Sequence, residues 1–126
     1  MLESLSITRM AEALADHAAS RLDLIARNVA QADTPGYKAM DLADFSQVYR
    51  DADGGMRATR PGHFTAAMTA LQPVAQPSHG EASPDGNTVS IEKEMVKSAE
   101  VRQDHDMALS VYRSTRDILR ASLGLR

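Results

Sequence analysis

The feature that most constrains this 126-residue chain is the run Asn28–Lys38, where a long helical pattern stops at Pro35 and Gly36. Proline disfavours a helical conformation in the residue before it and has no N–H to donate, so the helix should end near residues 32–33. Proline followed by glycine suits the centre of a type II turn, because proline fixes the first φ and glycine accepts a positive second one. The sequence therefore predicts a rigid corner with a turn over residues 34–37.

Residues 1–33, before the corner, carry the pattern of one amphipathic helix. Apolar side chains recur at steps of three or four residues, at Ile7, Ala11, Leu14, Ala18, Leu22, Ile25 and Val29. The many alanines on this segment would let a neighbouring helix approach closely. Charged residues interrupt it throughout, so it has no apolar run suited to a signal peptide or a membrane span. We expect a protein that is cytoplasmic or is exported without a cleaved signal.

Residues 34–88 have a different character, because most of the prolines and glycines fall there. We expect an irregular, partly extended middle segment with one short helix near 41–50, ended by the Asp53-Gly54-Gly55 turn. Residues 56–68 are expected to be extended in part. The run 72–87 is rich in Pro, Gly and Ser, which is typical of a flexible connector.

A second long helix is predicted over residues 89–126. Ser90 is a suitable N-cap, and Glu92 and Glu94 place negative charge in the first turn, where it complements the helix dipole. A heptad stripe runs through Ile91, Met95, Ser98, Arg102, His105, Leu109, Tyr112, Arg116, Leu119 and Leu123. This stripe becomes more apolar toward its end, so we expect that end to have more than one neighbour.

Together these elements predict an all-α single domain in which the two long helices pack antiparallel as a coiled-coil-like pair. The chain has no Trp, two Phe and three Tyr, so the core must come mainly from aliphatic residues and Met. Charge favours the antiparallel arrangement, because residues 112–126 hold four arginines and the first helix starts with several acids. We expect residues 107–125 to lie beside residues 5–20, with Tyr112 and Leu119 facing Leu14.

The amino-acid sequence of the corner is similar to a signature of bacterial flagellar axial proteins, which form the rod and hook. The usual pattern of that family is Asn-x-Ala-Asn-x-x-Thr-x-Gly-Tyr/Phe-Lys. Six positions match it, namely Asn28, Ala30, Thr34, Gly36, Tyr37 and Lys38, and Pro35 lies inside the motif. Gln31 departs from it, because the family most often has a second Asn there.

A second resemblance points to particular members of that family. The segment from Asp85 to Glu100, with Asp-Gly-Asn followed by Glu-Lys-Glu-Met, resembles the proximal rod members of that family. Ala39-Met40-Asp41 and the Arg57-Ala58-Thr59 run with His63 resemble their middle segments. The resemblance covers most of the chain in the right order, and the other short rod protein, FlgC, is the nearest alternative.

This resemblance implies a structural subunit of the proximal rod of the flagellar basal body. Such a subunit would be exported uncleaved by the flagellar type III apparatus and would assemble in the periplasmic rod. The implied partners are further copies of itself, FlgC and other rod proteins, the adaptor protein FliE and the export-gate membrane complex. The implied assembly motif is Asn28, Ala30, Thr34, Pro35, Gly36, Tyr37 and Lys38, and the expected helix-packing residues are Ile7, Leu14, Leu22, Ile25, Val29, Met95, Leu109, Tyr112, Ile118, Leu119 and Leu123.

Other classes of function are less well supported. His105 lies between two aspartates, but adjacent helix residues point about 100 degrees apart, and neither residue 101 nor residue 109 is a possible ligand. No nucleophile or phosphate-binding motif is present, so we expect no enzyme, no metal, no cofactor and no small-molecule substrate. A net charge of -3 argues against nucleic acid. The remaining alternative is a cytoplasmic helical adaptor or flagellar export chaperone.

Overall fold

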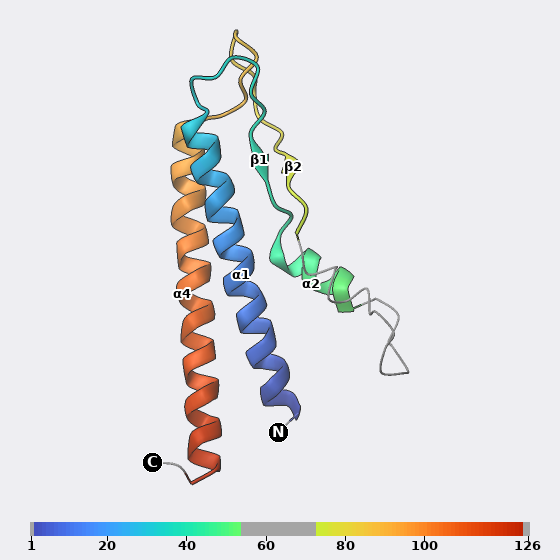
Figure 1. Ribbon diagram of the computed structural model, residues 1–126, viewed down its shortest axis with the longest axis vertical. Coiled ribbons are helices and arrows are strands. Elements are labelled where there is room, and N and C mark those ends of the chain that lie inside the picture. Colours follow the sequence, from blue (N-terminus) through green and yellow to red (C-terminus); the bar gives the residue numbers. More distant parts are fainter. Residues whose placement is uncertain (1, 54–72, 125–126) are drawn as a thin grey trace.

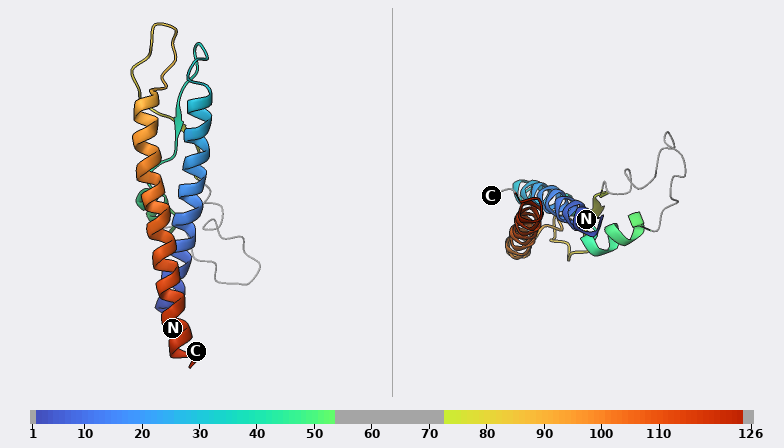
Figure 2. Two further views of the ribbon diagram at one scale, coloured as in Figure 1. Left: turned by 90° about the vertical axis from the view of Figure 1, so that its left-hand side faces the viewer. Right: turned by 90° about the horizontal axis from the view of Figure 1, so that it is seen from below.

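The computed structural model describes residues 2–53 and 73–124, and two long helices dominate it (Figure 1). Helix α1 covers Leu2–Ala30 and helix α4 covers Ile91–Ser122. The two lie side by side and run in opposite directions, so the start of α1 and the end of α4 share one end of the molecule (Figures 1 and 2). The predicted antiparallel packing of the two long helices is confirmed.

The two helices meet along one narrow seam whose buried residues recur every seven positions. On α1 these are Ala11, Ala18 and Ile25, and on α4 they are Glu94, Val101, Ala108 and Thr115. A seven-residue repeat of buried positions is the packing pattern of a coiled coil. Because alanine occupies several of these positions, the helices approach closely and enclose little apolar volume.

The predicted heptad stripe on α4 needs a correction, because half of it lies one residue too late. Met95 was expected at the seam, yet it is 68% exposed, whereas Glu94 is 2% exposed. Likewise Ala108 is buried and Leu109 only half-buried. The prediction placed Met95 and Leu109 at the seam, but the seam uses the residue before each of them, which is hydrogen-bonded Glu94 and small Ala108. Arg102 and Arg116 are also exposed, with Val101 and Thr115 buried instead.

The register agrees with the predicted direction of pairing. Ala18, Ile25 and Val101 form one buried cluster, and Leu22 packs against it. Met107 lines the same cavity as Leu14. The part of α4 that follows Val101 therefore lies beside the first half of α1. The expectation that Tyr112 and Leu119 face Leu14 stays a prediction.

The chain is mostly helical, as predicted, and its middle also contains a small two-stranded sheet that the all-α class did not include. Strand β1, Met40–Asp41, pairs antiparallel with strand β2, Gln76–Pro77. The strands form because long-range contacts hold this backbone extended. The buried Asn28 side chain engages both the N–H and the carbonyl of Met40, at 3.0 and 2.8 Å.

Helix α2 covers Phe45–Asp53 and begins later than the predicted short helix near 41–50. Its first hydrogen bonds go to the carbonyl of Asp44, from Gln47 at 2.9 Å and Val48 at 3.1 Å. Helix α2 does not begin near residue 41, because Asp41 belongs to β1. The predictions for Gly54, Gly55 and residues 56–68 lie outside the described residues, and the predicted flexibility of 72–87 stays a prediction.

Both long helices are shorter than expected. Helix α1 ends at Ala30 instead of residues 32–33, because the N–H groups of Ala32 and Thr34 bond to the third residue back and not to the fourth. Helix α4 ends at Ser122 instead of 126, because Gly124 adopts a positive φ of 68°, as is common just beyond a helix end. The predicted Ser90 cap is confirmed, with its side chain accepting from Lys93 N at 3.5 Å. Neither these helices nor α2 has the length and apolar character needed to cross a membrane.

Candidate functional site

The corner after α1 has the predicted turn. Gly36 adopts a φ of 74°, and the N–H of Tyr37 donates to the carbonyl of Thr34 at 3.3 Å. This is the arrangement of a type II turn, with proline and glycine at its centre. Pro35 and Gly36 are exposed at the tip, so the turn is available to contact other molecules.

A second loop, residues 83–87, locks against this turn. The N–H of Gly36 donates to the carbonyl of Asp85 at 3.0 Å, and the N–H of Thr88 donates to the carbonyl of Tyr37 at 3.0 Å. The Lys38 ammonium donates to the carbonyl of Gly86 at 2.9 Å. The two loops lie next to each other beyond the helix ends (Figure 2, left). The two motifs found far apart in the sequence therefore form one structure, the interlocked corner of residues 31–38 and 83–88.

Two glycines allow this close approach. Gly86 adopts a φ of 83°, and a Cβ atom there would lie 3.5 Å from the Cα atom of Gly36. Any side chain at either position would be strained by the positive φ, and a branched one most of all. The glycines are therefore part of how the loops interlock.

Asn28 connects three elements behind the corner. Its side chain is fully buried and donates to the carbonyl of Met40 and, at 3.0 Å, to the Glu94 carboxylate. Its oxygen accepts from the N–H of Met40 and, at 3.3 Å, from the Tyr37 hydroxyl. Every position of this amide is thus used, and α1, β1 and α4 are joined through one side chain.

Asn87 closes the end of α1. Its side-chain nitrogen lies within hydrogen-bond distance of the carbonyls of Gln31, Ala32 and Thr34, at 3.0, 2.8 and 2.9 Å. Its side-chain oxygen accepts from the N–H of Val89 at 2.7 Å. Two of these carbonyls also accept backbone bonds within the corner, Gln31 from the N–H of Thr34 and Thr34 from the N–H of Tyr37. Asn87 therefore gathers the carbonyls of the turns that follow α1 around one buried side chain.

A partly buried ion network continues from Asn28 along the seam. Asp41 accepts from Arg21 at 2.8 Å and from Lys97 at 3.0 Å, and Lys97 also contacts Glu94 at 3.1 Å. Burial by itself would raise the pKa of Asp41, but hydrogen bonds from Arg21, Lys97 and the N–H of Leu42 outweigh it and lower the pKa to about 2. The Asp41 hydrogen bond raises the pKa of Arg21 against the effect of burial. Burial lowers the pKa of Lys97, yet its bonds to Asp41 and Glu94 raise it overall. Asp41, Arg21 and Lys97 therefore stay charged over the physiological pH range.

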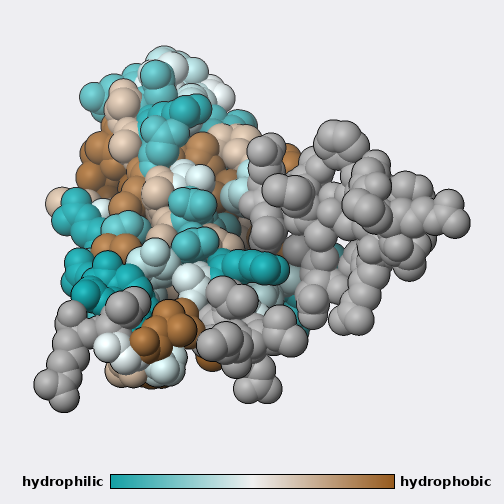
Figure 3. Space-filling view, turned by 60° about the horizontal axis from the view of Figure 1, so that its bottom comes forward, coloured by the Kyte–Doolittle hydropathy of each residue, from teal (hydrophilic) through white to brown (hydrophobic). Residues whose placement is uncertain are grey.

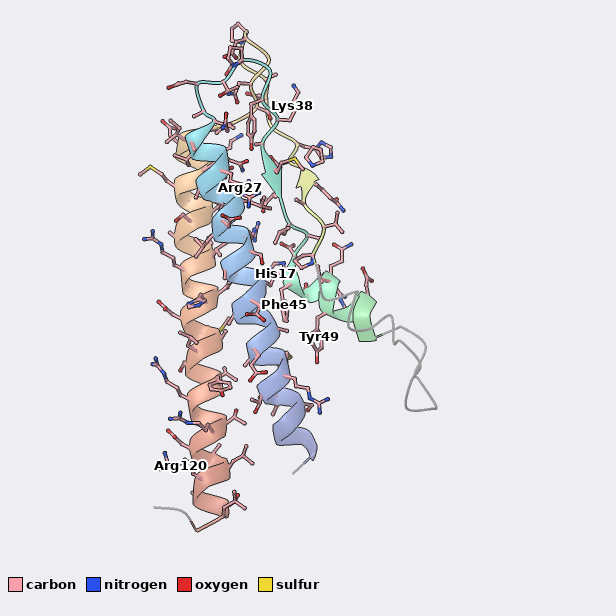
Figure 4. All side chains as sticks on the ribbon, viewed as in Figure 1. His17, Arg27, Lys38, Phe45, Tyr49 and Arg120 are labelled. Atoms are coloured by element: carbon pink, nitrogen blue, oxygen red, sulfur yellow. The ribbon has the colours of Figure 1, made fainter. Side chains whose placement is uncertain are left out.

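The α2 segment is attached to α1 by one aromatic cluster. Buried His17 has its Nε2 atom 2.9 Å from the carbonyl oxygen of Ala43, and its ring meets Phe45 edge-on at 5.6 Å. Phe45 in turn contacts Tyr49 at 5.5 Å (Figure 4). The contact sets the direction in which α2 leaves the helix pair.

The predicted helix-packing residues fall into two groups within the single chain. Ile25 is buried, and Leu14, Leu22, Leu109, Tyr112 and Leu119 are half-buried. The others are exposed, namely Ile7, Val29, Met95, Ile118 and Leu123. Beside the seam, an open groove of about 690 Å³ runs along Leu22, Ile25 and Val29 of α1 and Met95, Ser98 and Ala99 of α4.

The predicted assembly motif is also divided in space. Asn28 and Tyr37 point inward and hold the corner together, whereas Ala30, Thr34 and Lys38 are exposed. Thr34 donates to the Gln31 side chain at 2.6 Å, so the longer amide at this position is used locally. Sequence reasoning missed Asn87, Arg21 and Lys97 as functional partners. The Asp-Gly-Asn sequence gave the signal that could have found Asn87, but it entered the prediction through the family resemblance, without any contact for Asn87.

Among the described residues, no three His, Asp or Glu side chains form a group that could hold a metal ion. The charged groups near the corner instead form ion pairs and hydrogen bonds that join one element to another. The arrangement can hold a shape and present surfaces. It gives no indication of a reaction centre.

Comparison with known proteins finds similar sequences among flagellar rod proteins. No family model matches the chain. A flagellar basal body rod protein FlgB from Escherichia coli is 33% identical over 104 residues, covering 73% of this chain and 74% of that protein. FlgB from Salmonella typhimurium is 31% identical over 103 residues, or 74% of this chain and 75% of its own length. FlgB from Agrobacterium fabrum is 27% identical over 120 residues, or 90% of this chain and 89% of that protein.

Proposed function

This chain belongs to the FlgB family of flagellar basal body rod proteins and is a structural subunit, not an enzyme, and we propose that it assembles through the outer faces of its helix pair and through its interlocked corner. As a rod protein it interacts with other components of the basal body. The proposal concerns which of its surfaces make those contacts.

The observation that carries the proposal is the set of large apolar side chains that the single chain leaves uncovered. Met95 is 68% exposed, Ile118 67% and Leu123 59%. Hydrophobic patches lie between hydrophilic ones at the end of the molecule where α1 starts and α4 ends (Figure 3). Fully burying one such side chain stabilises an assembly by about 1.5 to 3 kcal/mol, so neighbouring subunits gain from covering them. Larger uncovered apolar surfaces commonly mark contact sites.

The corner contributes direction. Its exposed turn at Pro35 and Gly36 is held by hydrogen bonds from both halves of the chain, so it is rigid relative to the helix pair. Because the corner is rigid, the backbone leaves the helix pair at the same angle in every subunit. Repeated contacts of one kind then build a regular structure.

The finer placement follows the family resemblance. We propose a position in the proximal, periplasmic part of the rod, after export without cleavage by the flagellar type III apparatus. The proposed neighbours are further copies of this chain, FlgC, the adaptor FliE and the export-gate complex. Because the relatives above are named FlgB rod proteins, FlgC itself, a cytoplasmic adaptor and an export chaperone are less well supported identities for this chain.

The test is purification of basal bodies from a bacterium whose only copy of this gene is a tagged one. The tagged chain should co-purify with the rod. Replacing Ile118 by Ser should remove the chain from basal bodies, because it removes an exposed apolar side chain. Replacing the adjacent exposed Asp117 by Ser should not, because neighbouring residues on a helix point about 100 degrees apart and Asp117 therefore belongs to another face. A chain found only in the cytoplasmic fraction would contradict the proposal.

A further inference from the structure

We propose that Asn87 is a positioning residue for rod assembly, because it sets the direction in which the Pro35 turn leaves α1. This inference rests on the proposed function and names a residue on which that function depends. Asn87 lies in the Asp-Gly-Asn loop before α4 and is 2% exposed. It therefore acts on the corner from the opposite half of the chain.

The chemistry at this position requires a short side chain that donates and accepts at once. The nitrogen faces the carbonyls of Gln31, Ala32 and Thr34, and the oxygen faces the N–H of Val89. Aspartate has the same shape but offers no donor when ionised, and its charge would face three carbonyl oxygens. It would also lie at the negative end of the α1 dipole. Asparagine meets all of these demands within this space.

In most antiparallel helix pairs a short loop joins the two adjacent helix ends, and here the Asn87 side chain joins them. Residues 31–90 separate α1 from α4, so the backbone does not directly connect their adjacent ends. The Asn87 side chain instead links the end of α1 to Val89, just before α4 begins. Its backbone is fixed as well, since its N–H donates to Asp85 at 3.1 Å and its carbonyl accepts from Ser83 at 2.8 Å.

The corner and the seam are held by different residues. Within the described part of the chain, the hydrogen bonds of Asn87 go to residues 31–34, to Ser83 and Asp85, and to Val89. The helix pair is joined by its buried heptads and by the contact of Asn28 with Glu94. Loss of Asn87 should therefore loosen the corner while the helices remain paired.

The experiment compares the full-length chain with its Asn87→Asp variant. Amide hydrogen exchange of the purified subunit should be roughly tenfold to a hundredfold faster at Gly36 and Thr88, because their bonds hold only while the loops are locked. Exchange at Ala18 and Val101 in the seam should be unchanged. In cells, the variant should be missing from basal bodies. The matched control is Gln47→Glu, which adds the same negative charge at an exposed position on α2, outside the corner, and which should leave both readouts at wild-type levels.

A pH profile separates positioning from general damage. Protonating the new carboxylate, below about pH 4, restores one O–H donor toward the carbonyls. After correction for intrinsic exchange, Gly36 in the variant should regain part of its protection relative to wild type between pH 6 and pH 3. Equal loss of protection at both pH values would overturn the donor argument.

Two results would overturn the inference itself. One is a variant whose corner exchanges quickly while rods form at wild-type levels, and the other is a variant whose corner amides are unchanged. Failure of the wild-type chain to enter basal bodies would instead contradict the proposed function. The two failures are therefore distinguishable.

Discussion

Replacing Asp41 by Asn tests whether the buried ion network, rather than the apolar seam alone, holds β1 against the helix pair. The carboxylate accepts from Arg21 on α1 and from Lys97 on α4. Asparagine keeps the shape but removes the charge. Arg21 would lose its ion-pair partner, whereas Lys97 would keep Glu94.

The magnitude follows from the pKa of Asp41. Its ordinary value of 3.8 falls to about 2 in the folded chain, so the ionised form favours folding. One pKa unit corresponds to about 1.4 kcal/mol, and this difference therefore amounts to about 2 kcal/mol of stability. The side chain is only 17% exposed, so solvent screening removes little of it. Because the folded pKa is the lower one, this stability is present above about pH 4 and is lost as the pH falls toward 2.

The assay is urea unfolding of the purified subunit, followed by circular dichroism at several pH values. At pH 7 the Asp41→Asn variant should lose about 2 kcal/mol of its free energy of unfolding. The difference from wild type should shrink steadily between pH 4 and pH 2, because wild-type Asp41 becomes neutral there too. The matched control is Asp23→Asn, which breaks the exposed pair with Arg27 and should change stability by about 0 to 1 kcal/mol.

The reasoning would be refuted by a loss of stability that is the same at pH 7 and pH 2. Such a result would mean that the substitution acts through packing and not through charge. An equal effect of Asp23→Asn would also refute it. In that case, burial of the network would contribute nothing that a surface ion pair lacks.

Three further predictions concern the corner, the end of α4 and the seam. Gly36→Val should cost about 1 to 3 kcal/mol at the turn and block rod assembly. Gly36→Asn should still assemble, because asparagine adopts a positive φ with less strain than valine; normal motility with valine would contradict this. Truncation after Thr115 should abolish assembly but change subunit unfolding only slightly, since Ile118 is mostly exposed; rods built from the truncated chain would show this to be wrong. Ala108→Leu should cost about 1 to 3 kcal/mol in urea unfolding by overpacking the seam, and Leu109→Ala should cost less; the reverse order would place the seam at residue 109.

Local patterns were sufficient for the long elements and the corner. The three-to-four spacing from Ile7 to Ile25 predicts α1, and Ser90 marks the start of α4. Proline and glycine predict the turn because their own covalent structure limits φ, with little influence from distant residues. Charge indicated the direction of pairing, since opposite ends of the two helices carry opposite excess charge.

The position of the seam on α4 was decided only by tertiary packing. The predicted heptad stripe passes through Met95, but the buried position is Glu94. A carboxylate can occupy that position only because Asn28 and Lys97 arrive there to bind it. A sequence pattern assigns Glu94 to the surface because it cannot know which partners will be near it.

The sequence by itself thus determined two amphipathic helices and the turn that follows the first of them. Tertiary structure decided the sheet of Met40 with Pro77, the closing of α1 by Asn87 and the ion network around Asp41. The physical reason is the range of the interactions. Backbone preferences and capping act within a turn or two, whereas a buried polar group is stable only beside partners that folding brings from the other half of the chain.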